Sequence, residues 1–108
     1  MQQVTTEQEI EQAFAQHEKI FLFKNSTTCP ISEAAYEELK AFDEENDTGI
    51  PVYYLHVQDS RSLSNWVADE WSIKHESPQA LLLKEFDVIW SKSHYDIKKD
   101  ALRDATKG

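Results

Sequence analysis

The stretch Thr27–Ser32, which holds the only cysteine of the chain, most constrains what this sequence can fold into. It lies between a continuous apolar run, residues 20–23, and a segment whose apolar side chains repeat with helical spacing. Proline lacks an N–H and its fixed φ suits a first helical turn, so Pro30 predicts a helix that begins beside Cys29. The unpaired N–H groups of such a turn stabilise an anion, and a thiol reacts as its thiolate. The pattern therefore indicates a reactive thiol between a strand and a helix.

The rest of the chain alternates helical and strand patterns. The periodicities predict helices over residues 7–17, from Pro30 to before Gly49, from Ser60 or Ser62 to about Trp71, and over 97–105, and strands over 20–23, 50–57, 80–83 and 88–90. The first two strands flank one helix and should pair in parallel. The last two are separated only by a turn near residues 85–87 and should form an antiparallel hairpin. The prediction is an α/β fold in which helices flank a central, mixed, four-stranded sheet.

Composition narrows the class of protein. A chain of 108 residues, 40% of them hydrophobic, fits a single domain over residues 1–108. The formal charge of −9 argues against nucleic acid or an anionic membrane as a partner. No stretch approaches the roughly 20 apolar residues that span a bilayer, and the first residues do not resemble a secretion signal. A lone cysteine fits a reducing, cytoplasmic location, and the cysteine and histidine spacing predicts no metal site.

The predicted element order, the cysteine at the start of the second helix and Pro78 at the start of a later strand together resemble the thioredoxin-like fold. Dithiol members of that fold carry Cys-x-x-Cys, whereas here a serine follows in Cys29–Pro30–Ile31–Ser32. More narrowly, the string Thr28–Ser32 and the chain length resemble the monothiol bacilliredoxins of bacteria that use bacillithiol in place of glutathione.

The resemblance implies an activity and its participants. Cys29 would be the only nucleophile, with Thr28, Pro30, Ile31 and Ser32 as the supporting motif, and would remove bacillithiol from mixed disulfides on client proteins. Bacillithiol would be a co-substrate, no cofactor would be bound, and bacillithiol or another thiol would regenerate Cys29. Ser32 cannot attack as a second cysteine would, but it can donate a hydrogen bond to the thiolate.

The resemblance also implies a second part of the site. In that fold the later proline is cis and lies beside the cysteine, and the residue before it bonds to the substrate peptide. These positions correspond to Pro78 and Ser77. Because bacillithiol carries a malate and is anionic, a protein of charge −9 needs a local positive region. Candidates at the same sheet edge are Lys24, Arg61 and Lys74, with His75 as a candidate general acid.

Two other functions remain open at this point. Some monothiol glutaredoxins with a Cys-Gly-Phe-Ser loop share an iron–sulfur cluster, although Pro30–Ile31 replaces Gly-Phe in this chain. Alternatively, the chain is a thioredoxin-like interaction module without a redox role, in which Cys29 is only a small apolar residue of the interior.

Overall fold

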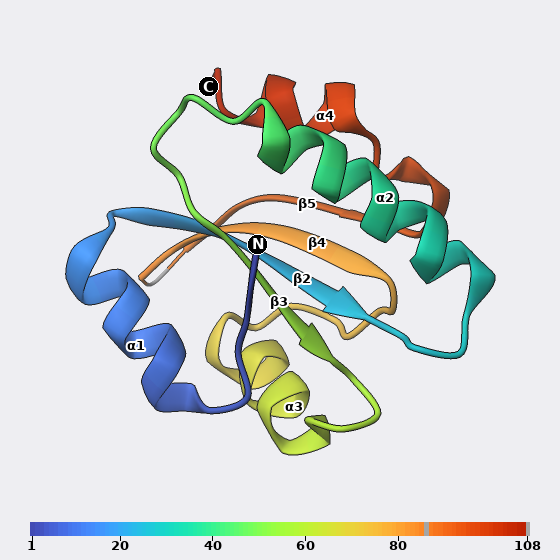
Figure 1. Cartoon of the computed structure of the whole chain (residues 1–108). Coiled ribbons are helices and arrows are strands. Elements are labelled where there is room, and N and C mark those ends of the chain that lie inside the picture. Colours follow the sequence, from blue (N-terminus) through green and yellow to red (C-terminus); the bar gives the residue numbers. More distant parts are fainter. Residues whose placement is uncertain (86, 108) are drawn as a thin grey trace.

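One five-stranded sheet with helices on both faces organises the computed structural model, which describes residues 1–85 and 87–107 (Figure 1). The strands are β1 (Gln2–Gln3), β2 (Lys19–Asn25), β3 (Val52–His56), β4 (Gln79–Lys84) and β5 (Val88–Ser93). The helices are α1 (Glu7–Gln16), α2 (Pro30–Glu44), α3 (Arg61–Glu70), the short 3-10 helix η1 (His94–Asp96) and α4 (Lys99–Ala105). The strand order is β1-β3-β2-β4-β5. The β1–β3 and β3–β2 pairs are parallel, and the β2–β4 and β4–β5 pairs are antiparallel.

The predicted α/β class and mixed sheet are confirmed, but the predicted strand count of four is wrong. The fifth strand, β1, pairs in parallel with Tyr53 and Tyr54 of β3. The two glutamines of β1 include no β-branched or aromatic residue that would indicate a strand, so only the pairing with β3 reveals it. The β4–β5 hairpin is antiparallel as predicted, and residue 86 of the predicted turn lies outside the described residues.

Strand β2 is buried on both faces and carries the chain to the cysteine. Side chains alternate along a strand, so Phe21 and Phe23 face α2 while Ile20 and Leu22 face α1 and α3. All four are at most 1% exposed. The continuous apolar run is thus the signature of a strand covered on both sides, and its carboxyl end is a fixed platform for the loop that follows.

Helix α2 packs its apolar stripe onto one face of this sheet. Ala35, Leu39 and Phe42 are buried at helical spacing, and Phe42 meets the ring of Phe21 edge-on at a centroid distance of 5.3 Å. Figure 1 shows α2 and α4 on one side of the sheet and α1 and α3 on the other. Within the described part of the chain, no helix has the length and apolar character needed to cross a membrane.

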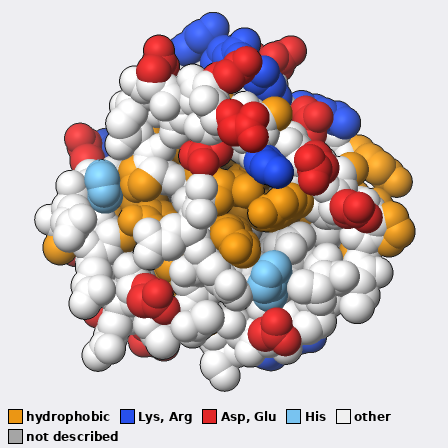
Figure 2. Space-filling view, viewed as in Figure 1, with side chains coloured by type: hydrophobic (Ala, Val, Ile, Leu, Met, Phe, Trp, Pro, Cys, Tyr) orange, Lys and Arg blue, Asp and Glu red, His pale blue; other side chains and the backbone are white. Residues whose placement is uncertain are grey.

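Ion pairs join the end of α2 to α4. The Glu45 carboxylate, directly after α2, accepts from Lys99 Nζ at 2.6 Å and from Arg103 Nη2 at 2.9 Å. In Figure 2, lysine and arginine side chains gather near the top, where Figure 1 places α4, and acidic side chains lie among them and also farther down the visible face. The two helices are therefore joined by both apolar and charged contacts.

Candidate active site

Cys29 stands at the junction of the β2 loop and α2. Its backbone is extended, with φ −110° and ψ 122°, and it occupies the N-cap position, with Pro30 opening the helix. The first helical hydrogen bond runs from Glu33 N to Cys29 O at 3.2 Å. The predicted start of the helix at Pro30 is therefore confirmed, and the cysteine lies where the unpaired N–H groups of the first turn converge.

These N–H groups act on the sulfur. The main-chain amides of Ser32 and Ile31 are the main groups that lower the pKa of the Cys29 thiol, burial opposes them slightly, and the Ser32 hydroxyl adds least. Cys29 makes no side-chain capping bond of its own and is partly exposed, so it is not a sealed apolar residue. Helix amides that stabilise a thiolate make it available at neutral pH and make it a better leaving group.

The Ser32 hydroxyl accepts one hydrogen bond from the cysteine loop and can donate another to the Cys29 sulfur. It is fully buried, and its Oγ accepts a hydrogen bond from Ser26 N at 3.2 Å. The hydroxyl proton remains available for the Cys29 sulfur, in line with the lowered pKa of that thiol. Ser32 therefore ties the start of the loop to the helix while it supports the anion.

Gln58, in the loop after β3, holds the cysteine loop from the other side. Its Nε2 donates to Ser26 Oγ at 2.7 Å and to Thr28 Oγ1 at 3.2 Å, and its Oε1 accepts from Thr27 N at 3.1 Å. Sequence reasoning missed Gln58 because its partners are about thirty residues away. The one available signal was that parallel β2 and β3 end at the same sheet edge.

The second predicted part of the site lies at this edge too. The Ser77–Pro78 peptide bond is cis, which confirms the predicted geometry of this bond. Pro78 immediately precedes the pair formed by Gln79 of β4 and Lys24 of β2, and its carbonyl accepts from His94 N at 3.1 Å. Ser77 and Pro78 thus border the end of β2 from which the cysteine loop starts, on the β4 side.

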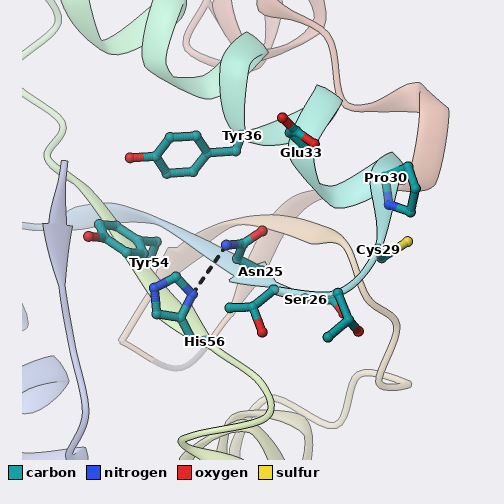
Figure 3. Close-up of a pocket in the computed structure, with 10 residues that line it drawn as sticks. Asn25, Ser26, Cys29, Pro30, Glu33, Tyr36, Tyr54 and His56 are labelled. Carbon is teal, nitrogen blue, oxygen red and sulfur yellow. Dashed lines mark hydrogen bonds between the residues drawn. The ribbon is translucent and has the colours of Figure 1, made fainter.

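A cavity of about 430 Å³ borders Cys29 on the β3 side (Figure 3). Tyr54 meets Tyr36 and His56 edge-on at centroid distances of 6.0 and 5.4 Å, and Asn25 Nδ2 lies 3.2 Å from His56 Nδ1. Figure 3 shows the sulfur pointing away from these rings. The lining residues are Asn25, Ser26, Thr27, Thr28, Cys29, Pro30, Glu33, Tyr36, Tyr54 and His56. The two tyrosines and His56 were not predicted, because they resemble ordinary half-buried strand and helix residues.

One predicted surface cation is wrong. Lys24 is 0% exposed, so it offers no charge to a ligand in solvent; its Nζ contacts Ser64 O at 3.0 Å and His75 Nδ1 at 3.2 Å. Arg61 and Lys74 are exposed, as a ligand contact would require. Across residues 1–85 and 87–107, no group of three or more His, Cys, Asp or Glu side chains is arranged to hold a metal ion.

Comparison of the chain with models of known protein families identifies the family to which it belongs. The family model described as monothiol bacilliredoxin BrxC matches residues 2–102, nearly the whole chain. The chain belongs to the monothiol bacilliredoxin family. This agrees with the cysteine at the helix start and the serine in place of a second cysteine.

Solved structures agree with this family. A structure described as a candidate oxidoreductase with a thioredoxin fold is 36% identical, with a TM-score of 0.88, over 96% of this chain and 91% of that one. A mutant thioredoxin from Halobacterium salinarum NRC-1 is 13% identical with a TM-score of 0.79, covering 98% and 87% of the two chains. Thioredoxin f from spinach chloroplast is 18% identical with a TM-score of 0.75, covering 98% and 89%. The last two show the fold alone, and the family membership makes this bacilliredoxin-family chain a thioredoxin-fold thiol oxidoreductase.

Proposed function

We propose that this protein removes bacillithiol from mixed disulfides on client proteins by thiol–disulfide exchange at Cys29. The observation that carries the proposal is the partly exposed sulfur at the start of α2, where the Ser32 and Ile31 amides favour its thiolate. Family membership supports the same chemistry.

The exchange takes place in two balanced steps. In the first, the Cys29 thiolate attacks the bacillithiol sulfur, a new disulfide forms, and the client sulfur leaves with the electron pair and takes a proton from solvent. In the second, the thiolate of another bacillithiol molecule attacks the bound bacillithiol sulfur. Cys29 then leaves as a thiolate, and bacillithiol disulfide is the product.

A lowered thiol pKa helps the second step more than the first. Attack gains from a larger thiolate fraction but loses intrinsic nucleophilicity, because nucleophilicity falls with pKa. In the second step Cys29 is the leaving group, and a thiol of lower pKa leaves faster, so no opposing effect reduces this gain. The amides of Ser32 and Ile31 therefore favour regeneration of Cys29, the step for which this chain has no second cysteine.

The cavity beside Cys29 is the proposed place for the sugar of bacillithiol, whereas the anionic malate would lie outside it, because the described lining residues include the Glu33 carboxylate and no lysine or arginine. Its volume of about 430 Å³ lies within the usual range of small-molecule sites. The Tyr36 and Tyr54 rings offer apolar faces for a sugar, and Asn25 and His56 offer hydrogen-bonding groups. Rotation about the Cα–Cβ bond of Cys29 is the motion that would turn the bound disulfide toward this cavity.

The test mixes the protein with a bacillithiolated client and follows both by mass spectrometry. We expect the client to lose one bacillithiol while Cys29 gains one, and we expect Cys29→Ser to show neither change. The same client carrying glutathione should react more slowly, and Tyr54→Ala should reduce that difference. An adduct that never forms would refute the redox function, and equal rates for the two thiols would refute bacillithiol selectivity. A visible chromophore after anaerobic purification would favour the iron–sulfur alternative.

A further inference from the structure

Lys24 is a buried lysine whose contacts in the described part of the chain include no carboxylate. It follows Ile20 and Leu22 on the β2 face that packs against α3, and it is 0% exposed. Among the residues that the structure describes, no ion pair includes its Nζ. Burying an ammonium without an opposite charge is costly, so a lysine at this position calls for an explanation beyond packing.

The contacts of Lys24 lead to the segment that precedes the cis proline. Its Nζ donates to the Ser64 carbonyl of α3 and to His75 Nδ1, at 3.0 and 3.2 Å. Ser64 Oγ lies 3.3 Å from the same His75 nitrogen. An ammonium can only donate, so Nδ1 of a neutral His75 ring accepts from Lys24 and the ring proton lies on Nε2. Burial, followed by the charges of Lys24 and Arg61, lowers the pKa of His75, while Glu76 opposes the shift; a neutral ring is therefore favoured.

The segment 74–77 depends on such side-chain contacts. Its described residues make no main-chain to main-chain hydrogen bond. The other anchor nearby is Gln79 Nε2, which donates to Lys74 O at 3.0 Å, and the Ser93 side chain lowers the pKa of the Glu76 carboxyl. Ser77 Oγ is buried without a hydrogen-bond partner among the described residues, so it adds no anchor. Few contacts therefore fix the peptide that leads into the cis Ser77–Pro78 bond.

We propose that Lys24 is a positioning residue, which from inside the fold holds segment 74–77 so that Ser77, the partly exposed residue before the cis proline, can receive the polypeptide of a client disulfide. The inference rests on the proposed exchange at Cys29. Lys24 itself touches no substrate, because it is fully buried. Its effect should therefore fall on substrates that have a peptide chain, and should spare small disulfides that need only the sulfur.

The protonation of Lys24 agrees with this role. Burial lowers its pKa to about 8, so Lys24 loses its proton more readily than an exposed lysine but still mostly holds it at pH 7. Two of the three N–H groups of the ammonium meet acceptors, Ser64 O and His75 Nδ1. Both acceptors are neutral groups, one on α3 and one on segment 74–77.

The test uses Lys24→Met, which keeps an unbranched side chain but removes the donors. Two substrates are compared: a peptide with bacillithiol on its cysteine, and bacillithiol disulfide. We expect the second-order rate for the peptide to fall at least tenfold, and the rate for the small disulfide to change less than twofold. Backbone ¹⁵N order parameters at residues 75–77 should fall, while the Cys29 pKa stays the same. Lys19→Met, at the other end of β2, is the matched control and should change neither rate.

Several outcomes would overturn the inference. A peptide rate that stays within twofold of wild type would do so, and so would an equal loss on both substrates. His75→Ala removes the same contact from the loop side. It must also slow the reaction of the peptide and spare that of bacillithiol disulfide. Agreement between the two variants would exclude a folding defect that affects only Lys24→Met. If the wild-type protein reacts with neither substrate, the proposed function fails, but unchanged backbone order parameters at residues 75–77 in Lys24→Met still separately refute the positioning role.

Discussion

The reactivity of Cys29 depends more on main-chain atoms than on any neighbouring side chain. The Ser32 and Ile31 amides lower the pKa of the thiol, and their positions are fixed because Pro30 starts the helix immediately after the cysteine. The Ser32 hydroxyl contributes least of the groups that lower this pKa. Side-chain substitutions near the sulfur should therefore change the pKa less than changes that displace the first turn.

A thiolate titration by ultraviolet absorbance tests this expectation. The Cys29 pKa should lie below the value of about 8.5 for free cysteine. Ser32→Ala should raise it only slightly, because the two amides remain, and Cys29→Ser should abolish the titration. Ser62→Ala, in the first turn of α3, should leave the midpoint unchanged. A wild-type midpoint at or above that of free cysteine would contradict the role assigned to the amides.

At the scale of elements, the site is made by joining loops that follow different strands. Gln58, after β3, makes its hydrogen bonds to the loop after β2, and Val57 N donates to Asn25 O at 2.9 Å across the same gap. The cysteine loop is thus ordered from a neighbouring loop, while α2 supplies the amides.

Replacing Gln58 should loosen the cysteine loop without unfolding the protein. For Gln58→Leu we expect the Thr27 amide to exchange about fivefold faster, which corresponds to roughly 1 kcal/mol for the lost hydrogen bonds. The matched control is Gln12→Leu on the exposed side of α1, which should leave Thr27 unaffected. Hydrogen exchange measured by NMR distinguishes the two. A Thr27 amide that exchanges at the wild-type rate in Gln58→Leu would show that the loop is ordered by other contacts.

The charged link between α2 and α4 predicts a modest, salt-dependent effect. Lys99 and Arg103 lower the pKa of Glu45, so this link stabilises the fold above the ordinary glutamate pKa and is lost as pH falls through the lowered value. Glu45→Gln should lower Tm slightly at pH 7 and low salt, and the difference should shrink in high salt. Glu44→Gln provides a control next to it. An equal Tm loss at all salt concentrations would point to packing instead of charge.

On the scale of the whole molecule, Lys24 should cost stability. Its pKa falls from the ordinary 10.5 to about 8 because burial disfavours the ammonium. Below pH 8 the folded and unfolded chains both hold the proton, and the full cost is present. Between about 8 and 10.5 the unfolded chain holds more protons, so the contribution of Lys24 to stability rises with pH, by a total of order 3 kcal/mol.

Lys24→Met should therefore be more stable than wild type at pH 7. We expect a gain of about 1–2 kcal/mol, since lost hydrogen bonds offset part of the relieved burial cost. The gain should shrink as pH rises from 8 to 10, which urea unfolding at several pH values would measure. A variant less stable than wild type at pH 7, with a difference independent of pH, would show that Lys24 is a net stabiliser.

The features that depend on neighbouring residues could be predicted from the sequence, whereas those that depend on contacts between distant residues could not. The start of α2 followed from Pro30, and the buried β2 followed from its apolar run. The cis geometry of Pro78 followed only from the family resemblance, because the peptide alone gives no such signal. The role of Gln58 and strand β1 depend on contacts that only the folded chain creates. Lys24 was misread because lysine is usually exposed, although alternation with Ile20 and Leu22 placed it on an interior face.

The serine in the first turn of α2 has a consequence for how the protein can be observed. With a single sulfhydryl, one molecule has no means of storing oxidation as an internal crosslink. A small thiol that forms a mixed disulfide with Cys29 therefore stays attached until another thiol removes it, and the mass of the adduct identifies that thiol. The intact mass of the protein isolated from cells would therefore show which small thiols were bound to Cys29, and in what proportion, at the time of sampling.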